Sequence, residues 1–378
     1  MLKKSKIKVF HLITHSFWGG AQKICYEIVK NLDKEKFEVE VGAKGGGELE
    51  KKLQKEKIKF FNFDFLERDF SLIKDIQAFI SLYFFFKKRK YDILHCHSTK
   101  AGILGRLAGK LAGIKKIYFT AHGWGFYNKE EYGWARKILV FLEKISARVS
   151  SKIICVAEKV KEDALKEKIA DEKKFLVIKN GVDAPKKNFR EVVREELKIK
   201  KNEIVFGFVG RLSYPKDPLM FIKAAKKVSK NFDNLKFLII GDGPLRKKCE
   251  DFLKKEKLKN VFLLGEKKPE ETQKYMFSFD VFCLTSKFEG LPLTVIEAMH
   301  CGIPVLGTKV GGMPELIKDG KNGFLVTSFE ELVNKMTLLI KNPSLRERLG
   351  KNAKKIAQKY FSLERMIKEY ERLYLGKD

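Results

Sequence analysis

Short apolar runs alternate with amphipathic segments along the whole chain, and this alternation restricts the possible folds more than any other feature. The runs are rich in Ile, Val, Leu and Phe, which is typical of parallel strands buried on both faces. A first series occupies residues 7–13, 37–43, 58–63, 93–97, 117–121, 153–156 and 175–178. A second series occupies residues 204–210, 237–240, 261–264, 281–284, 305–308 and 324–326. Amphipathic segments such as 21–32 and 219–230 lie between them, so the pattern predicts repeated βαβ units and two doubly wound α/β domains.

The division between the two series predicts the domain boundary. A chain of 378 residues is long enough for two cores of ordinary size. A polar stretch containing Pro185 follows residues 180–183, and a fresh strand begins near Ile204. We therefore predict one domain over residues 1–183 and another over residues 184–360. Residues 361–378 contain one more amphipathic helix.

The net charge of +30 suggests a polyanion as a partner, but its distribution does not favour a dedicated nucleic-acid module. Residues 1–183 hold 38 basic and 23 acidic residues, and the remainder holds 40 and 25, so each half carries +15. Most of the excess is Lys, which is poorer than Arg at bidentate recognition of phosphates and bases. The even spread favours a lysine-rich surface, with which attraction to an anionic membrane is compatible.

The cysteines and the apolar segments indicate a cytoplasmic chain. None of the six cysteines forms a C-x-x-C pair, so we expect reduced thiols with neither a disulfide framework nor a zinc knuckle. The basic and then apolar first residues imitate a signal peptide, but they lead into Gly19 and Gly20 and are better interpreted as a strand. No apolar stretch has the length of a membrane-spanning helix. Residues 76–86, followed by basic residues 87–90, could lie at a membrane interface, but we favour a core-facing helix with a basic end.

Ligands of open α/β sheets bind beyond the carboxyl ends of the strands, so the residues that follow each run are candidates for the site. Gly19 and Gly20 follow the first run and open a helix, which suits close approach of an anion. The third glycine of a dinucleotide-binding fingerprint is missing, so a dehydrogenase is not supported. His122, between Ala121 and Gly123, could donate to a substrate hydroxyl or phosphate, or could simply stabilise a turn.

Two strand ends in the second half carry cations and glycines. Arg211 and Lys216 lie five residues apart across a Pro-containing loop, and together could neutralise a pyrophosphate leaving group without a metal. On spacing alone, two solvated cations would be the more ordinary explanation. Gly241 opens a Gly-Asp-Gly-Pro turn, where Pro244 is expected near the first position of a helix.

The most specific segment runs from Phe288 to Met299. Pro292 suits the start of a helix and Gly302 its end, which places Glu289 in the preceding loop and Glu297 inside the helix. Free N–H groups near Gly290 and Leu291 would point toward a ligand bound by this loop. The two carboxylates could accept hydrogen bonds from sugar hydroxyls, or could act as a general acid and base in glycoside hydrolysis.

His95 and His97 end a strand, and alternation puts both on one face. A metal site would need a third ligand, for which the spacing of the sequence offers no candidate. We therefore interpret both as structural or pocket-lining histidines and predict no metal site.

Taken together, these segments resemble the retaining glycosyltransferases of family 4, which have the GT-B fold. The resemblance runs nearly end to end. It rests on residues 19–22, 97–113, 120–124 and 180–183, on Arg211 with Lys216, on residues 241–244, and on the two glutamates separated by seven residues. It implies two Rossmann-like domains facing across a cleft, with the acceptor on the first, the donor on the second, and a terminal helix crossing back to the first.

The resemblance also implies roles for individual residues. Arg211 and Lys216 would bind the donor diphosphate, and Glu297 would hold the ribose hydroxyls. Glu289 and the backbone of Gly290, Leu291, Pro292 and Leu293 would contact the donor sugar at the reaction centre. His122 would contact the transferred sugar or the acceptor. Gly19, Gly20 and Gly241 would let the phosphates and the nucleotide approach the backbone. Gln22 stands where many relatives carry an acid, a departure interpreted as neutral for catalysis. Neither a metal nor another cofactor would be needed.

The segments around His97 and His122 look most like those of bacterial enzymes that build capsule, exopolysaccharide or lipid-linked oligosaccharide. The resemblance thus implies a UDP-sugar or GDP-sugar donor, and a glycan or polyprenyl-diphosphate-linked acceptor. It places the enzyme in the cytoplasm, with a peripheral membrane contact as one option. A sugar-nucleotide epimerase or a phosphorylase on the same fold is the alternative enzymatic class. A basic nucleic-acid-binding protein is the least favoured alternative.

Overall fold

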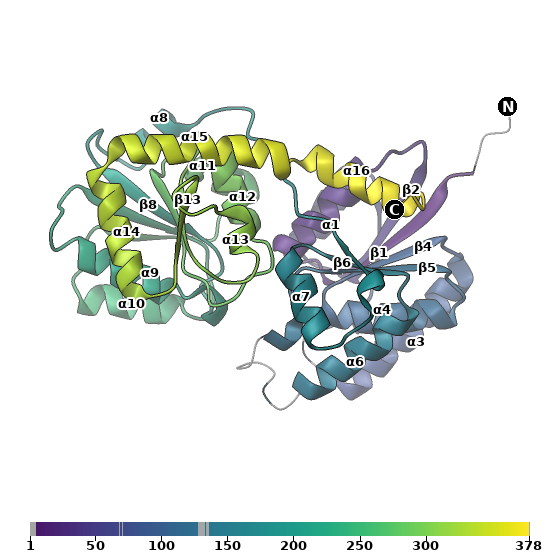
Figure 1. Ribbon diagram of the computed structural model, residues 1–378. Helices are drawn as coiled ribbons and strands as arrows, with labels where there is room; N and C mark the ends of the chain where they lie inside the picture. Colours follow the sequence, from purple (N-terminus) through teal and green to yellow (C-terminus); the bar gives the residue numbers. More distant parts are fainter. Residues whose placement is uncertain (1–4, 68, 70, 128–132, 134–135, 378) are drawn as a thin grey trace. The chain divides into compact units, whose positions relative to one another are not determined.

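The computed structural model describes residues 5–67, 69, 71–127, 133 and 136–377. The chain forms two compact units. The first comprises Met1–Asn180 together with Leu363–Asp378, and the second comprises Gly181–Ser362. The units divide after Asn180, whereas the sequence analysis placed the boundary after Asp183. The C-terminal segment from Leu363 belongs to the first unit (Figure 1).

The first unit contains a parallel sheet of seven strands in the order β3-β2-β1-β4-β5-β6-β7. Its strands are β1 (Ile7–His15), β2 (Phe37–Lys44), β3 (Lys59–Asn62), β4 (Ile93–His97), β5 (Lys116–Ala121), β6 (Lys152–Cys155) and β7 (Phe175–Val177). The chain moves outward from β1 to β3 and then crosses to β4 on the other side of β1. This reversal between β1 and β4 is the point at which open α/β sheets bind ligands.

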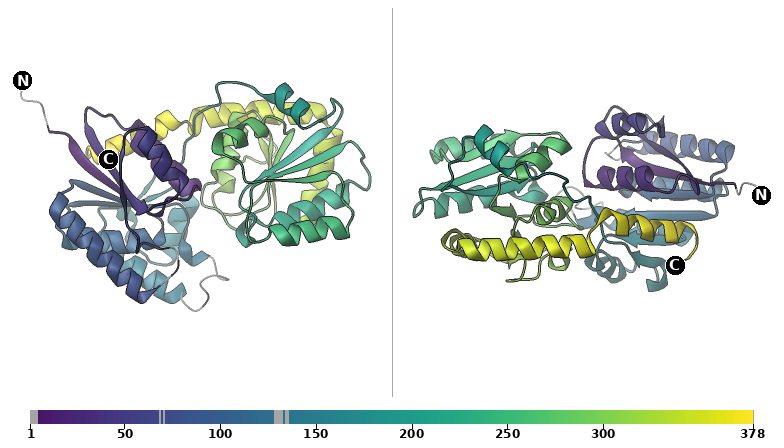
Figure 2. Two further views of the ribbon diagram at one scale, coloured as in Figure 1. Left: turned by 180° about the vertical axis from the view of Figure 1, so that it is seen from behind. Right: turned by 90° about the horizontal axis from the view of Figure 1, so that it is seen from above.

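Helices cover both faces of this sheet (Figure 2). They are α1 (Gly20–Asn31), α2 (Glu48–Lys55), α3 (Leu72–Arg89), α4 (Thr99–Leu111), α6 (Arg136–Val149), α7 (Glu158–Lys166) and α16 (Leu363–Tyr374), with single turns η1 (Gly125–Tyr127) and η3 (Glu172–Lys174). On one face α4 packs between α3 and α6, and on the other α16 packs against α1. The terminal helix therefore completes the core of the first unit, where Tyr370 and Tyr374 are fully buried.

The second unit repeats the plan with a parallel sheet of six strands in the order β10-β9-β8-β11-β12-β13. Its strands are β8 (Ile204–Val209), β9 (Leu235–Ile240), β10 (Val261–Gly265), β11 (Val281–Leu284), β12 (Val305–Thr308) and β13 (Gly323–Val326). Its helices are α8 (Arg190–Glu196), α9 (Pro218–Val228), α10 (Arg246–Lys255), α11 (Pro269–Met276), α12 (Leu293–His300), α13 (Met313–Leu316), α14 (Phe329–Lys341) and α15 (Pro343–Tyr360), with one turn η4 (Tyr214–Lys216). Here the order of the strands reverses between β8 and β11.

The predicted strands all appear, because the central strands are buried on both faces as their composition requires. All six residues of β8, for example, are buried. The amphipathic segments 21–32 and 219–230 become α1 and α9, each displaced by one or two residues. The two doubly wound α/β sheets confirm the predicted fold class.

The structure refines two local predictions. Pro244, expected near the first position of a helix, lies two residues before α10, and Leu245 is the N-cap residue. The core-facing helix expected over residues 76–86 is α3, which is longer, ends in the expected basic residues and buries only one of its faces. Ala78, Leu82 and Phe86 of α3 are buried, while apolar residues on its other face are exposed. The part of the chain that the structure describes contains no helix that is both long and apolar enough to cross a bilayer.

Candidate functional site

In the second unit, the predicted cations lie at the reversal point of the sheet. Arg211 comes two residues after β8 and is exposed, and among the described residues none lies within ion-pairing or hydrogen-bonding distance of its guanidinium. Lys216 ends the turn η4 and is partly buried. An exposed, unpaired arginine near a partly buried lysine leaves positive charge available at the carboxyl end of β8, where an anionic ligand can replace water.

Lys216 connects this loop to the loop that follows β11. Its Nζ lies 2.5 Å from Glu289 Oε1, and Ser286 Oγ donates to the same oxygen at 2.5 Å. Only 8% of the Glu289 side chain is exposed. The carboxylate is therefore held in one orientation by two donors, and the two loops that flank the reversal point are joined by a direct ion pair.

Glycines let the neighbouring loops pack closely behind this pair. Gly241 has a φ of +134°, and a Cβ there would lie 2.1 Å from the carbonyl oxygen of Gly210. Gly311 has a φ of +50°, and a Cβ there would lie 1.8 Å from the carbonyl oxygen of Glu289. A side chain at Gly241 would thus push its loop away from the loop that carries Arg211, and a side chain at Gly311 would do the same to the loop that carries Glu289.

The segment after Glu289 leads directly into α12. Pro292 caps the helix with extended backbone and offers no side-chain acceptor, so the first N–H groups of α12 have no cap. Leu291, Pro292 and Leu293 are buried, whereas Gly290 is partly exposed. Glu297 lies in the second turn of α12 and is partly exposed. Glu289 and an uncapped helix start are thereby brought to the same end of β11, as the sequence predicted for the loop and helix.

In the first unit, Gly19 and Gly20 open α1 after β1. Gly19 is the N-cap residue, with a φ of −170°, and Gly20 is exposed. Gln22 is buried and its Nε2 donates to the carbonyl oxygen of His15 at 3.1 Å. The side chain thus stabilises the turn between β1 and α1, which gives the glutamine a structural role.

His122 follows β5 and belongs to a row of histidines that the sequence analysis found only in part. His122 Nε2 lies 3.1 Å from His97 Nδ1, and His97 Nε2 lies 3.1 Å from His11 Nδ1. Burial lowers the pKa of His122 to about 4 and the pKa of His11 to about 3. It also holds the pKa of His97 well below its ordinary value. All three rings are therefore neutral at pH 7, and each has one N–H donor and one nitrogen acceptor.

The pair His95 and His97 was predicted to lack a third metal ligand, and the structure groups His97, without His95, with His11 and Cys25. His11 and Cys25 each place a potential ligand atom within 4.8 Å of the other two residues of the trio. Burial raises the pKa of the Cys25 thiol to about 12, which disfavours the thiolate that a metal requires. Both ring nitrogens of His11 and of His97 already have hydrogen-bond partners, so the geometry is also explained without an ion.

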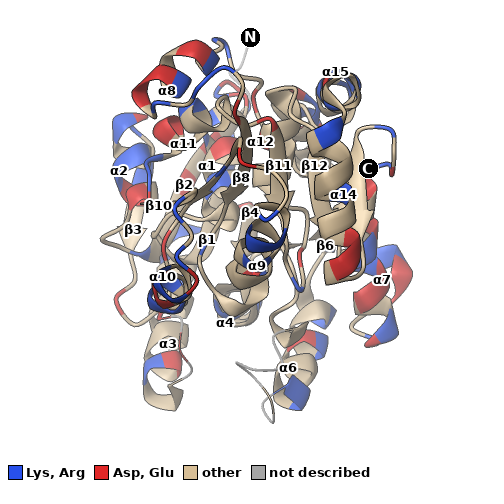
Figure 3. Cartoon of the chain, turned by 90° about the vertical axis from the view of Figure 1, so that its left-hand side faces the viewer, with Lys and Arg blue, Asp and Glu red and all other residues tan. Residues whose placement is uncertain are grey.

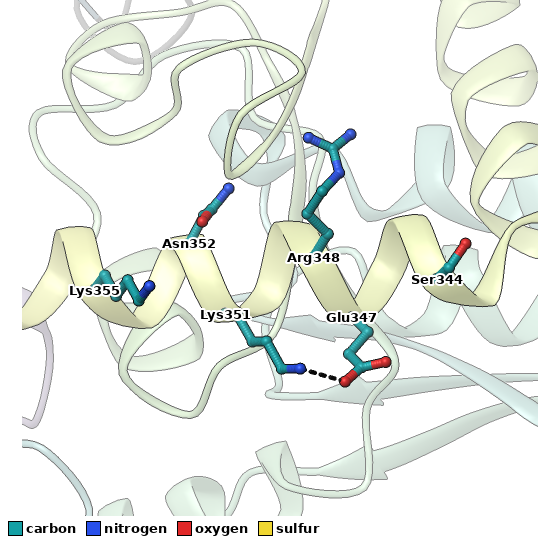
Figure 4. A pocket seen from close by; sticks show the side chains of 6 residues that line it. All are labelled: Ser344, Glu347, Arg348, Lys351, Asn352 and Lys355. Atoms are coloured by element: carbon teal, nitrogen blue, oxygen red, sulfur yellow. Dashed lines mark ion pairs between the residues drawn. The ribbon is translucent and has the colours of Figure 1, made fainter.

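A surface depression elsewhere in the second unit does not resemble a substrate site (Figure 4). Every side chain that lines it comes from α15: Ser344, Glu347, Arg348, Lys351, Asn352 and Lys355. Lys351 Nζ lies 2.5 Å from Glu347 Oε1, so two of these groups neutralise each other. One helix alone cannot enclose a ligand, and none of the predicted site residues lies there.

The residues that the sequence analysis missed are distant in the chain from those it found. Tyr374 OH contacts His95 Nδ1 at 2.5 Å and His11 Nε2 at 3.2 Å, over sequence separations of 279 and 363 residues. The one available signal was a histidine within an otherwise apolar strand, since His11 lies among the consecutive buried residues of β1. Neither Cys25 on α1 nor Tyr374 on α16 carries a pattern that distinguishes it from an ordinary core residue.

Comparison with known proteins identifies the family. Residues 18–185 match the family described as Glycosyltransferase Family 4, and residues 189–356 match Glycosyl transferases group 1. The chain is 32% identical to UDP-Gal:alpha-D-GlcNAc-diphosphoundecaprenol alpha-1,3-galactosyltransferase of Escherichia coli, over 98% of this chain and 97% of the relative. It is 26% identical to the capsular polysaccharide biosynthesis glycosyltransferase CapM of Staphylococcus aureus, over 97% and 96% of the two chains.

Solved structures show the same fold. HepE of Anabaena, in complex with UDP and glucose, superposes with a TM-score of 0.84 at 21% identity, over 98% of this chain and all of that one. WaaG, a glycosyltransferase involved in lipopolysaccharide biosynthesis, superposes with a TM-score of 0.77 at 16% identity, also over 98% and 100%. Two doubly wound units of this kind define the GT-B class of transferases. The chain belongs to family 4 of the glycosyltransferases and is a retaining enzyme that takes its sugar from a nucleotide-sugar donor, which confirms the expected family and activity.

Proposed function

We propose that the chain transfers a hexose, first of all galactose, from a UDP-sugar to a sugar carried on a polyprenyl diphosphate. The observation that carries this proposal is the match over nearly the whole chain to the Escherichia coli galactosyltransferase, whose name gives both substrates. The binding of UDP and glucose by HepE supports a uridine nucleotide. The product would be a lipid-linked oligosaccharide for surface polysaccharide, made at the cytoplasmic face of the membrane.

The cations at the end of β8 would hold the donor diphosphate. Arg211 is exposed and has no partner among the described residues, so it can bind phosphate oxygens through its planar fork without first breaking an ion pair. The uncapped start of α12 offers further donors at the end of the neighbouring strand β11. Together these groups would neutralise the departing diphosphate, so that catalysis proceeds without a metal ion.

The ion pair between Lys216 and Glu289 would change when the donor binds. A diphosphate near Lys216 competes with Glu289 for the ammonium group, because both are anions. Glu289 would then be free to accept hydrogen bonds from the hydroxyl groups of the donor sugar, while Glu297 binds the ribose. In this scheme the pair is a resting arrangement that keeps both side chains oriented until the donor arrives.

The first unit would supply the remaining contacts. Gly20 is exposed at the start of α1, and a backbone without a side chain there permits close approach of phosphates. Gly19 would serve in the same way, as would Gly241 in the second unit. His122 is partly exposed and neutral at pH 7, so it can exchange hydrogen bonds with the transferred sugar or with the acceptor hydroxyl.

A lipid-linked acceptor requires contact with a membrane, and α3 has the surface for it. Five apolar side chains on this helix are between 47% and 78% exposed: Leu72, Ile73, Ile76, Ile80 and Phe84. Their spacing of three and four residues puts Ile73, Ile76, Ile80 and Phe84 along one side of the helix, opposite the buried residues. We name these five residues the α3 apolar face.

Basic residues adjoin the α3 apolar face at its C-terminal end. Lys87, Lys88, Arg89 and Lys90 are all exposed, although Arg89 also stacks on the ring of Phe61. Elsewhere basic and acidic residues are mixed, as on α2, α7, α8 and α10 (Figure 3). An apolar stripe that ends in cations suits the headgroup region of an anionic membrane, because both the hydrophobic effect and the surface charge favour it.

A transfer assay tests the proposed function. The purified chain is incubated with UDP-galactose and a GlcNAc-diphosphate-lipid acceptor, and product mass is measured by mass spectrometry. We expect a mass increase of one hexose and an alpha linkage by NMR. Parallel reactions use UDP-glucose, UDP-GlcNAc and GDP-mannose, and incubation of the donor alone tests for epimerisation. Turnover with GDP-mannose only, or transfer only to acceptors without a diphosphate-lipid, would contradict the proposal.

A further inference from the structure

A continuous row of buried polar side chains runs inside the first unit from α16 to the loop after β5. Tyr374 OH lies 3.2 Å from His11 Nε2. His11 Nδ1 lies 3.1 Å from His97 Nε2, and His97 Nδ1 lies 3.1 Å from His122 Nε2. We propose that this row, whose first member comes from the terminal helix, fixes which ring nitrogen of His122 carries its proton.

The row can order its protons because its inner members have no access to water. Tyr374, His11 and His97 are 0% exposed. A neutral imidazole has one N–H and one unprotonated nitrogen, so each histidine must donate at one end and accept at the other. The row therefore has only two arrangements without an unsatisfied contact, one with every ring donating toward α16 and one with every ring donating away from it.

The two contacts of Tyr374 select one of these arrangements. Its hydroxyl oxygen lies 2.5 Å from His95 Nδ1 and 3.2 Å from His11 Nε2. The shorter contact is that of an O–H donor, and the longer one that of an N–H donating to the phenol oxygen. Tyr374 thus donates to His95 and accepts from His11. On the far side of its ring, His95 Nε2 then donates to Thr120 Oγ1 at 2.7 Å.

The remaining protons follow from this choice. His11 carries its proton on Nε2, so its Nδ1 accepts from Nε2–H of His97. His97 Nδ1 in turn accepts from Nε2–H of His122. His122 is left with an unprotonated Nδ1, which is a hydrogen-bond acceptor. The opposite arrangement would require Tyr374 to donate to His11 and would make His122 Nδ1 a donor.

The row gives α16 an effect on the chemistry as well as on the fold. Tyr374, His11 and His97 are positioning residues, because they act on substrate only through His122. On the proposed function, His122 Nδ1 would accept a hydrogen bond from a hydroxyl group of the sugar or the acceptor. The tautomer itself can be measured whether or not His122 has that role.

The test is the tautomer of His122 in protein labelled with ¹⁵N-histidine. Long-range ¹H–¹⁵N spectra distinguish the two neutral forms, and His122→Gln assigns the signal. We expect the Nε2–H form in the wild type. In Tyr374→Phe, His11 loses the acceptor for its Nε2–H, so the reversed row becomes accessible and Nδ1–H of His122 should appear. The control is Tyr91→Phe, which removes another buried hydroxyl of the first unit, one that donates to Glu40 and contacts no member of the row. This control should leave the His122 signal unchanged.

Kinetics provide the second readout. Tyr374→Phe should lower kcat about five- to tenfold, as expected for a weakened hydrogen bond in the transition state, and change the donor KM less than about twofold. A lower kcat requires the proposed role of His122, whereas the tautomer does not. If the tautomer of His122 shifts and kcat stays at the wild-type value, the row does fix the tautomer and the proposed role of His122 in the reaction is wrong.

Three results would overturn the row. The first is an Nδ1–H form of His122 in the wild type, which needs only the assignment by His122→Gln and so decides the matter even if Tyr374→Phe does not fold. The second is an unchanged His122 signal in a folded Tyr374→Phe protein. The third is a stoichiometric metal ion in the purified wild type that is lost in Cys25→Ser, because a metal bound by His11 and His97 would occupy the nitrogens that the row needs.

Discussion

Lys216 Nζ lies 2.5 Å from Glu289 Oε1, so the loops after β8 and β11 are joined by an ion pair that a diphosphate would have to compete with. Replacing Glu289 with Gln removes the competing charge and keeps the shape of the side chain. We expect UDP to bind about as tightly as in the wild type or a few-fold more tightly, while kcat falls at least about tenfold because the sugar loses a charged acceptor.

Calorimetry with UDP and steady-state kinetics measure the two effects separately in Glu289→Gln. The control is Glu347→Gln, which removes a carboxylate from an equally short ion pair on α15, away from both strand ends. It should change neither quantity. A parallel loss of UDP affinity and of turnover in Glu289→Gln would mean that the carboxylate only stabilises the loop.

Arg211→Ala tests the diphosphate contact directly. The guanidinium is exposed, and the described residues offer it no ionic partner, so its removal should leave the melting temperature unchanged. It should raise the donor KM and lower kcat, because the charge acts on both the bound donor and the leaving group. The resulting kcat/KM should be at least about 30-fold below the wild-type value. Arg348→Ala removes another exposed arginine, on α15, and serves as the control. Activity of Arg211→Ala within about threefold of wild type would contradict the assignment.

The metal prediction concerns the initial rate. If Arg211, Lys216 and the start of α12 neutralise the diphosphate, excess EDTA should leave the rate nearly unchanged. Dialysis against EDTA before the assay extends the test to ions held at His11, Cys25 and His97, which lie close enough to share one. A rate that falls on chelation and returns with Mg²⁺ or Mn²⁺ would show that a cation takes part.

Much of the fold could be predicted from the sequence because its signals are local. Strands buried on both faces need an apolar composition, and the strand ends then locate Arg211, Lys216 and Glu289 at the reversal of the second sheet. The ion pair between Lys216 and Glu289 could not be predicted, since it spans 73 residues and depends on the order of the strands. Residues 76–86 are apolar apart from Gln77, Ser81 and the hydroxyl of Tyr83, so their composition gave little sign that apolar side chains of α3 would remain exposed.

The histidines predict how stability depends on pH. Burial lowers the pKa values of His11 and His122 from 6.5 in the unfolded chain to about 3 and about 4, and depresses those of His95 and His97 well below 6.5. Below pH 6.5 the unfolded chain therefore binds protons that the folded chain does not. The free energy of unfolding has its full value above pH 6.5. It falls as the pH drops toward the pKa values of the folded state, by about 1.4 kcal/mol per pH unit for each buried histidine.

Urea unfolding at pH values from 7.5 to 5.0 measures this loss, and the window lies above the range in which carboxylates titrate. Tryptophan fluorescence reports the first unit selectively, because Trp18, Trp124 and Trp134 all belong to the sequence of that unit. A free energy of unfolding that stays constant between pH 7 and pH 5 would mean that these histidines are accessible to protons in the folded protein.

The last prediction concerns the α3 apolar face and the cations that follow it. Ile76→Ser, Ile80→Ser and Phe84→Ser together remove exposed apolar area without touching the buried face, so folding should be preserved and vesicle binding lost. A second variant changes Lys87 and Lys88 to Ser and Lys90 to Asn, since Lys90 has a φ of +53° that Asn tolerates. It leaves Arg89 in place because that side chain packs on Phe61. Each Lys near an anionic surface contributes about 1 kcal/mol to binding, so this variant should bind anionic vesicles far more weakly. Added salt should weaken the binding of the wild type to the same vesicles.

Co-sedimentation with anionic and neutral vesicles measures both effects. The control replaces Lys247, Lys248, Lys254 and Lys255 of α10, four exposed lysines of the second unit, with Ser. Equal loss in this control would show that total charge rather than α3 binds the membrane, and a concentration-dependent dimer that the apolar variant abolishes would show that a second copy covers the face instead.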